Sequence, residues 1–257
     1  MVQLQWYAYP LAILAGALAG AINTLAGSGS LIALPMLIFL GLPANVANGS
    51  NRIGVLVQNL VGFRTYQASG TANLKGWLWL VIPGALGSII GAQIAVNLDQ
   101  KAINMAIGVV MVLMLLVVLL DPQRWLRVHS EVREGRPGIP LMLLFLAIGI
   151  YGGFIQAGVS LFVLAALVMG VGYNLSDGNA VKLLIVLTFN ITAFVIFILN
   201  AQVNWWLGGL LAVGQSLGAW GAARFATKSK NANQWIRWLL IVVLVFTALK
   251  LFGLLPF

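Results

Sequence analysis

The chain has 257 residues, of which 61% are hydrophobic and only 7% are charged, and its formal net charge is +9. A soluble domain carries about 25% charged residues, so this composition is typical of a protein that lies largely within a membrane. The absence of cysteine, with a single histidine in a polar stretch, excludes disulfides, thiol catalysis and clusters of thiolate or imidazole metal ligands. Enzymatic catalysis and a bound cofactor are therefore not expected.

The first half of the chain reads as five helical segments. A break is expected at Gly27-Ser28-Gly29, and a turn at 41–43. Charge-free runs of about 20 residues, such as 102–120, have the length that an α-helix needs to cross the hydrocarbon core of a bilayer. The predicted helices cover residues 10–26, 30–40, 47–67, 74–97 and 100–120.

The second half repeats this order after a hydrophilic linker at 121–138, which we expect to separate a first transmembrane repeat, 1–120, from a second one, 139–257. A second break is expected near Ala157-Gly158, and a turn at 170–173. The predicted helices of this half cover residues 139–156, 160–169, 176–199, 205–227 and 234–252.

An ungapped shift of 130 residues aligns the two halves. It places Ser30 on Ser160, Arg52 on Lys182, Gly84 on Gly214 and Gly91 on Gly221. The segment over 30–40 is too short to span the membrane alone, so it is expected to form a broken or re-entrant pair with the preceding helix. With three further helices, each half crosses the bilayer an odd number of times. The predicted fold is therefore an all-α polytopic membrane protein of two inverted-topology repeats.

The distribution of lysine and arginine predicts the orientation. Most of the cations near helix ends fall on the face that carries the linker, whereas Lys101 and Lys250 fall on the opposite face. Cytoplasmic loops carry the excess of positive charge, so the linker should be cytoplasmic and both termini should be outside. This bias also accounts for the net charge without a nucleic-acid partner.

Arg52 and Lys182 are cations within otherwise apolar stretches. A charge near the bilayer centre costs roughly 2.5 to 3.5 kcal/mol on insertion scales, so each should face protein or a water-filled cavity and find a partner. Asp177, the only acidic residue nearby, could neutralise Lys182, and carbonyl groups could satisfy Arg52. Two cations sharing at most one acid nevertheless indicate an anionic substrate, and Arg52 is the preferred ligand if only one cation binds it.

Polar and small residues near these cations complete the candidate site. The serines that follow the breaks are expected to cap short helices whose N-termini attract an anion, although glycine and serine also serve simple helix packing. Asn45 and Ser176 are expected to be helix caps. Asp177 is the candidate for proton coupling. Besides the two cations, the predicted substrate-binding residues are Ser28, Gly29, Ser30, Asn48, Asn51, Asn59, Gln156, Gly158, Ser160 and Asn179.

Several of these residues lie in segments that have a recognisable pattern. These segments are residues 19–35 (AGAINTLAGSGSLIALP), Leu40-Gly41-Leu42-Pro43 and Ala47-Asn48, with the small-residue helices at 84–91 and 214–221 in support. Together they resemble the TauE/SafE sulfite exporter family. This resemblance implies export of sulfite, organosulfonates or related small anions by a multi-pass protein of the bacterial inner membrane. The second half keeps the serine and the cation but has Ala157-Gly158-Val159 in place of Gly-Ser-Gly.

The sequence therefore predicts a secondary transporter that moves a small anion by alternating access between its halves. An anion channel, or a membrane scaffold in which the cations are structural, remains open as an alternative. The expected partners are the anion and membrane lipid, and the small-residue helices also make a homodimer credible. Trp77, Trp79, Trp205 and Trp206 are expected to be anchors at the membrane interfaces.

Overall fold

The computed structural model describes residues 6, 8–68, 78–120, 137–173 and 175–226. Within these ranges all regular structure is helical, which confirms the predicted all-α class. The elements in chain order are α1 (Ala8–Ala26), α2 (Ser30–Phe39), α3 (Ala44–Ala68), α4 (Leu78–Asn97), α5 (Gln100–Leu120), α6 (Ile139–Phe154), α7 (Val159–Ala166), the π-helix η2 (Leu167–Val171), α8 (Leu175–Leu199) and α9 (Trp205–Ala226).

Most helix bounds agree with the sequence prediction to within a few residues. Helix α3 begins at Ala44 because the Pro43 carbonyl accepts the Ala47 N–H, so Asn45 lies in the first turn and the prediction that it caps the helix is wrong. The predicted helix at 160–169 is α7 continued by the wider turn of η2. The predicted helix at 234–252 and most of the linker lie outside the described residues.

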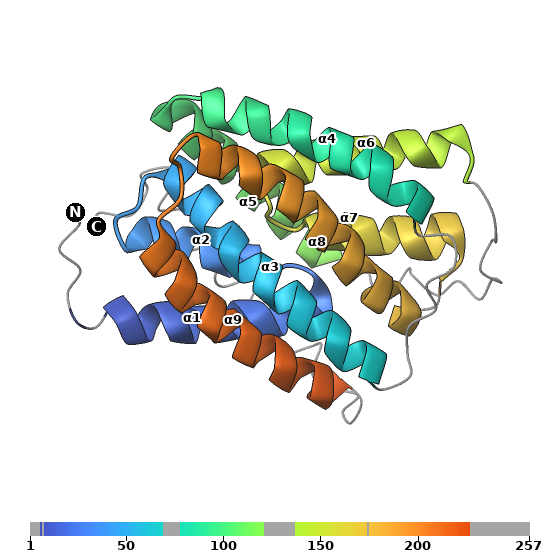
Figure 1. Cartoon of the computed structure of the whole chain (residues 1–257), viewed down its shortest axis with the longest axis horizontal. Helices are drawn as coiled ribbons and strands as arrows, with labels where there is room; N and C mark the ends of the chain where they lie inside the picture. The colour runs from blue at the N-terminus through green and yellow to red at the C-terminus, as the bar shows by residue number, and fades with distance from the viewer. Residues whose placement is uncertain (1–5, 7, 69–77, 121–136, 174, 227–257) are drawn as a thin grey trace.

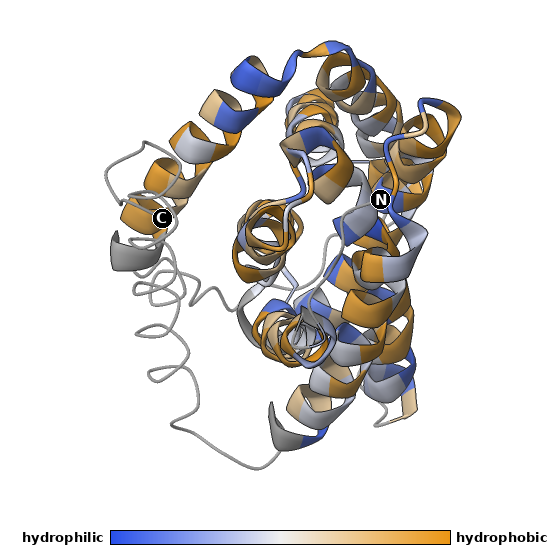
Figure 2. Ribbon diagram, turned by 90° about the vertical axis from the view of Figure 1, so that its left-hand side faces the viewer, coloured by the Kyte–Doolittle hydropathy of each residue, from blue (hydrophilic) through white to orange (hydrophobic). Residues whose placement is uncertain are grey.

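The described helices have the lengths and surfaces of membrane-embedded elements. Three are long and apolar enough to cross a membrane, at Leu78–Asn97, Gln100–Val117 and Asp177–Leu199. Shorter apolar helices surround them, and large aliphatic side chains such as Ile82, Leu86 and Leu116 are exposed on the outside. Hydrophobic residues make up most of the helical ribbon in Figure 2. Soluble monomers rarely expose so much apolar surface.

Helices from the two halves of the chain are interleaved. In Figure 1, α4 and α6 form one side of the bundle, α1 and α9 form the other, and α3 and α8 run between them. Helices α1, α3 and α9 begin at the left end of this view, whereas α4, α6 and α8 begin at the right end. Each of the pairs α1·α9 and α4·α6 therefore joins a helix of the first half to one of the second.

Glycines allow the outer pairs to pack backbone against backbone. A Cβ at Gly20 would lie 2.0 Å from the Gln215 carbonyl oxygen, and one at Gly214 would lie 2.1 Å from that of Ile13. The α4·α6 pair makes the same kind of crossing. Small residues four apart permit this close approach in membranes, where burial from lipid supplies little driving force. The glycines at the two crossings are Gly16, Gly20, Gly214 and Gly218, and Gly87, Gly91, Gly149 and Gly153.

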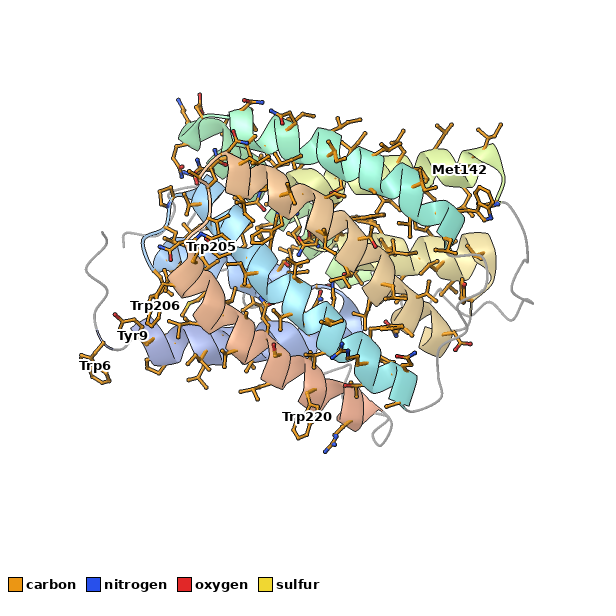
Figure 3. The ribbon with its side chains drawn as sticks, viewed as in Figure 1. Trp6, Tyr9, Met142, Trp205, Trp206 and Trp220 are labelled. Atoms are coloured by element: carbon orange, nitrogen blue, oxygen red, sulfur yellow. The ribbon has the colours of Figure 1, made fainter. Side chains whose placement is uncertain are left out.

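Aromatic side chains mark the ends of the bundle. Trp6, Tyr9, Trp205 and Trp206 gather at the left end in Figure 3, and Trp220 lies near the opposite end of α9. The ring of Tyr9 packs edge-on to Trp206 with centroids 6.3 Å apart, and the Arg224 guanidinium lies 4.3 Å from the Trp220 ring centroid. Exposed tryptophans at helix ends are typical of membrane–water interfaces. The bundle axis should therefore follow the bilayer normal.

Gly214→Ala should destabilise the protein, because its new methyl group would collide with the α1 backbone. Overpacking of this kind costs about 1 to 3 kcal/mol. Gly221→Ala is the matched control on the same helix, since no atom of the described residues lies within 4 Å of the added Cβ. Its removal of a flexible helical glycine should be neutral or stabilising by up to about 1 kcal/mol. Thermal unfolding of both variants in detergent tests this, and equal stabilities would contradict the proposed crossing.

Candidate functional site

The two chain breaks meet in the interior. Helix α1 ends before Gly27 and α6 ends before residues 155–158, and Gly27 and Gly158 both adopt the left-handed conformation, at φ +76° and +73°. A Cβ at Gly27 would lie 2.9 Å from the Ser160 Cβ, so the first break lies directly against the start of α7. Ser28, Ser30 and Ser160 are all buried. The structure thus places the first break against Ser160, a predicted site residue of the second half.

The prediction that serines cap the short helices is wrong. The N-cap residues are Gly29 of α2 and Gly158 of α7, and neither helix has a side-chain cap hydrogen bond. A side chain at Gly29 has no room, because its Cβ would lie 2.0 Å from the Ala19 carbonyl oxygen. The Ser28 and Gly29 carbonyls themselves accept the N–H groups of residues 31–33. Close packing on α1 therefore decides which residue occupies the cap.

Arg52 is completely buried and is bonded to three different segments. Its Nη1 donates to Gln156 Oε1 at 3.1 Å and to Asn190 Oδ1 at 3.2 Å. Its Nη2 donates to the carbonyls of Gly152 and Gly153, at 3.3 and 2.5 Å. The Phe197 ring centroid lies 4.6 Å from the guanidinium carbon. The planar fork of arginine thus joins α3 to the end of α6, to the second break and to α8.

Neighbouring amides reinforce these connections. Asn48, one turn before Arg52, donates to the carbonyl of Phe154, the last residue of α6, at 2.8 Å. Asn190 donates back to the Arg52 carbonyl at 2.8 Å. The last carbonyls of a helix have no N–H partners within that helix. Side-chain donors of α3 therefore bond to the carbonyls that a further turn of α6 would have paired.

A second network joins α2, α3 and α9. Asn51 Nδ2 donates to Ser30 Oγ at 3.1 Å, and Asn51 Oδ1 accepts from Gln215 Nε2 at 3.3 Å. All three side chains are buried. Ser30 and Asn51, both predicted as site residues, are thus in direct contact.

Lys182 is also completely buried. Its ammonium donates to Asn179 Oδ1 at 2.7 Å, which joins two predicted site residues one turn apart on α8. Asp177 lies in the first turn of the same helix. Among the described residues, every hydrogen-bond acceptor that reaches Arg52 or Lys182 is neutral.

Several buried polar atoms near the cations lack a partner within the described part of the chain. Asn59 is the extreme case, because both of its amide atoms are unpaired and the residue is 0% exposed. Other buried atoms also lack a hydrogen-bond partner among the described residues, namely Arg52 Nε, Asn48 Oδ1, Gln58 Oε1 and Gln215 Oε1. Leaving such groups unpaired costs about 1 to 3 kcal/mol each, so they indicate a place for a polar ligand or ordered water.

Some residues of this centre were not among the predicted ligands. Asn190 could have been found from its polarity within an apolar helix, and Gln215 by the same signal in α9. The carbonyls of Gly152 and Gly153, and the Phe197 ring, leave no such signal, because their role depends on which segments meet in space.

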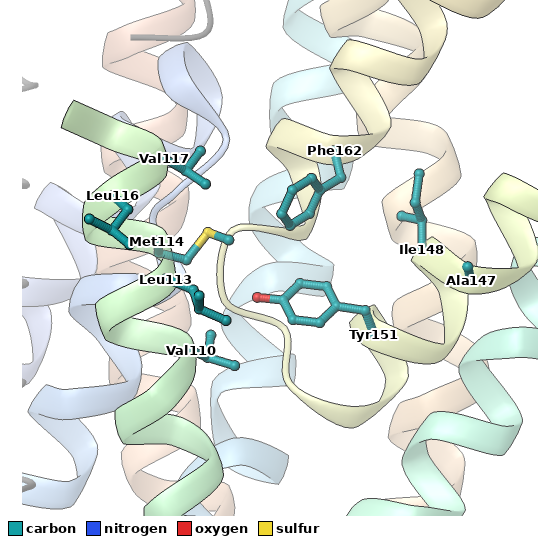
Figure 4. A pocket seen from close by; sticks show the side chains of 9 residues that line it. All are labelled: Val110, Leu113, Met114, Leu116, Val117, Ala147, Ile148, Tyr151 and Phe162. Atoms are coloured by element: carbon teal, nitrogen blue, oxygen red, sulfur yellow. The ribbon is translucent and has the colours of Figure 1, made fainter. Parts of the chain in front are cut away.

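An apolar crevice of about 550 Å³ lies beside the second break. Figure 4 shows Tyr151 and Phe162 facing side chains of α5, among them Met114 and Val110. The Tyr151 hydroxyl donates to the Ala157 carbonyl at 2.5 Å, which ties the break to α6. The hydrocarbon lining makes this space unsuitable for an anion.

Arg52→Lys should lower stability strongly, because an ammonium cannot reach four acceptors held in the plane of a guanidinium. Breaking a buried charged network by removing one partner costs about 3 to 5 kcal/mol. Arg64→Lys, at an exposed position on the same helix, should change stability by less than about 0.5 kcal/mol. The melting temperatures of the purified variants test this, and a stable Arg52→Lys protein would contradict the structural role of the fork.

Comparison with known proteins gives consistent names. The family described as "Sulfite exporter TauE/SafE" matches residues 12–251. A "Probable membrane transporter protein ORF9" of Sinorhizobium sp. is 27% identical over 98% of this chain and 95% of its own length. A "Probable membrane transporter protein" of Haemophilus influenzae is 27% identical over 84% of each chain, and YfcA of Escherichia coli K12, named likewise, is 27% identical over 91% of this chain and 86% of its own.

No solved structure matches this chain. The family match covers almost all of the described helices, including both breaks and both buried cations. Together with the apolar outer surface, it identifies a helical membrane protein of a transporter class. The chain belongs to the sulfite exporter TauE/SafE family.

Proposed function

We propose that the chain is a secondary transporter that exports a small sulfur-containing anion, sulfite or an organosulfonate, across the bacterial inner membrane. The observation that carries this proposal is the burial of two cations whose protein acceptors, among the described residues, are all neutral. A buried positive charge without an acidic partner is unfavourable, and an anion entering the centre would neutralise it. The family and the names of its relatives support transport.

The arrangement of helices supports alternating access by two inverted repeats. Equivalent helices of the two halves begin at opposite ends of the bundle, as α3 and α8 do in Figure 1. The glycine crossings α1·α9 and α4·α6 pair the first helix of one half with the fourth of the other. Gly91 and Gly218 occupy equivalent places in the two crossings, because each packs on a backbone carbonyl of the partner helix. By contact, Gly91 therefore corresponds to Gly218, whereas the 130-residue shift aligned it with Gly221. Rocking of one repeat against the other would expose the centre to each side in turn.

The breaks would form the walls of the central site. Gly27 lies against Ser160, and Ser30 is bonded to Asn51, so movement of either short helix would reshape the space near the cations. We place the anion between the breaks and the α3·α8 pair. The predicted orientation would put the linker in the cytoplasm and the termini outside.

Purified wild-type protein should bind sulfite and methanesulfonate saturably and should not bind dimethyl sulfone, a neutral molecule of similar shape. The charge difference isolates the electrostatic part of recognition, which is large in a water-poor site. Isothermal titration calorimetry at low salt measures all three affinities. Equal binding of the neutral sulfone, or no binding of any anion, would contradict the proposal.

Proton coupling, if present, should depend on Asp177, a carboxylate in the first turn of α8 near the buried Lys182. Asp177→Asn should abolish the response of anion flux to an imposed pH gradient, because the amide cannot carry a proton. Flux in proteoliposomes with and without the gradient measures this. A variant whose flux still follows the gradient as in the wild type would eliminate Asp177 from coupling.

A further inference from the structure

We infer that the two buried cations have different tasks: Lys182 and Asn59 form the subsite that holds the anion, whereas Arg52 holds the second break in place. This inference rests on the proposed anion transport and divides the site that transport requires. It also reverses the expectation that Arg52 is the principal ligand. The argument depends on which hydrogen-bond donors the protein has already used.

Arg52 has few unused N–H donors for a ligand. A guanidinium carries five N–H donors, and both terminal nitrogens of Arg52 are already bonded to four oxygens of the protein. The Phe197 ring lies against the guanidinium. The remaining donor, Nε, is buried and has no partner among the described residues. An anion that displaced the terminal bonds would release the end of α6 and the second break together, because Gly152, Gly153 and Gln156 are the acceptors.

Lys182 has the opposite pattern. An ammonium has three N–H donors, and the described part of the chain supplies one acceptor, Asn179 Oδ1. Lysine presents a compact charge whose donors can rotate toward a ligand, whereas the arginine fork is fixed by its planar geometry. Two donors of a fully buried ammonium thus remain for an anion.

Asn59 adds a neutral donor that is equally unused. It lies on the same face of α3 as Arg52, two turns further on, and at 0% exposure neither of its amide atoms has a partner in the part of the chain that the structure describes. Val55, one turn before it, belongs to the same buried cluster as Val159 of α7 and Val181 and Ile185 of α8. Asn59 is therefore on the stripe of α3 that borders α7 and α8.

The antiparallel packing of α3 and α8 places Asn59 and Lys182 at similar depths. Arg52 is level with Asn190, to which it is bonded, and a Cβ at Gly62 would lie 3.1 Å from Leu183 Cδ1. Moving along α3 from Arg52 to Gly62 therefore corresponds to moving back along α8 from Asn190 to Leu183. Asn59 falls near the second of these contacts, within about one helical turn, roughly 5 Å, of the level of Lys182.

This pair matches the chemistry of a sulfonate or sulfite group. Such a group presents several oxygen acceptors around one sulfur atom. The two remaining N–H donors of Lys182 could bind two of them, and Asn59 Nδ2 could bind another. The Asn59 carbonyl oxygen would remain for a water molecule or a protonated ligand oxygen. The charge-assisted bonds would supply most of the affinity, and the amide would add orientation.

The first test compares methanesulfonate binding by Lys182→Met, Asn59→Leu and Gln202→Met. Both subsite variants should bind roughly tenfold more weakly or worse, because a buried charged or amide donor is lost. Lys182→Met should melt no lower than the wild type, since an apolar side chain of similar size replaces a buried charge. Gln202→Met is the control, because Gln202 also has an Oε1 atom without a partner among the described residues, but it lies between α8 and α9, where its Nε2 donates to the Val96 carbonyl. It should bind as the wild type does.

The second test uses the absence of native cysteine, which makes a single introduced thiol unambiguous. The thiol of Asn59→Cys should react with an anionic methanethiosulfonate reagent, and methanesulfonate should slow this reaction whereas dimethyl sulfone should not. A thiol that the reagent never reaches, or that the anion does not protect, would contradict the subsite. This measurement holds even if one of the other variants fails to fold.

The outcomes separate this inference from the proposed function. Wild-type protein that binds no anion would contradict the function itself. Wild-type binding that persists within about twofold in both Lys182→Met and Asn59→Leu would contradict the subsite alone. Selective loss in Arg52→Lys, at unchanged melting temperature, would return the role of principal ligand to Arg52.

Discussion

A guanidinium that water cannot reach has to be satisfied by the protein, and the centre of this structure is organised around that requirement. Arg52 bonds the carbonyls that end α6, the side chain of the second break and an amide of α8. Asn48 adds a bond to the last residue of α6. Because these acceptors lie 100 to 138 residues from Arg52 in sequence, the interaction joins the two halves of the chain at this centre.

Close helix packing makes this arrangement possible. Among the described helices, α3 carries the largest number of buried polar side chains, so it has to be enclosed by other helices rather than by lipid. The glycine crossings bring the outer pairs together until backbone touches backbone, and α3 and α8 lie between them. Helix α3 can therefore be polar while the outer faces of the bundle are apolar.

The sequence predicts the parts of the fold that depend on local patterns. Hydrophobic length locates the helices, and Gly27 and Gly158 mark breaks because each adopts a backbone conformation that other residues rarely adopt. Burial of Arg52 and Lys182 also follows from the apolar stretches around them. The identity of the caps could not be predicted, because close packing against Ala19 forces glycine at position 29 where an isolated helix would favour serine.

The pairing of residues distant in sequence is the part that could not be predicted. Nothing in the sequence shows that the carbonyls of Gly152 and Gly153 accept from Arg52, so the sequence favours Arg52 as the ligand because Asp177 lies near Lys182 in the chain. In the folded chain, most N–H donors of Arg52 are bonded to protein oxygens, whereas the ammonium of Lys182 donates to one acceptor among the described residues. Lys182 therefore has more donors left for a ligand than Arg52. On the assignment proposed above, a structural cation and a ligand cation occupy the two positions that the 130-residue shift aligns.

Counterflow in proteoliposomes tests the central claim most directly. Vesicles loaded with unlabelled methanesulfonate and diluted into a trace of labelled anion should accumulate label transiently, and the initial rate should saturate with concentration, because one central site is exposed to each side in turn. Flux that rises linearly with concentration and shows no stimulation by anion on the opposite side would contradict the account.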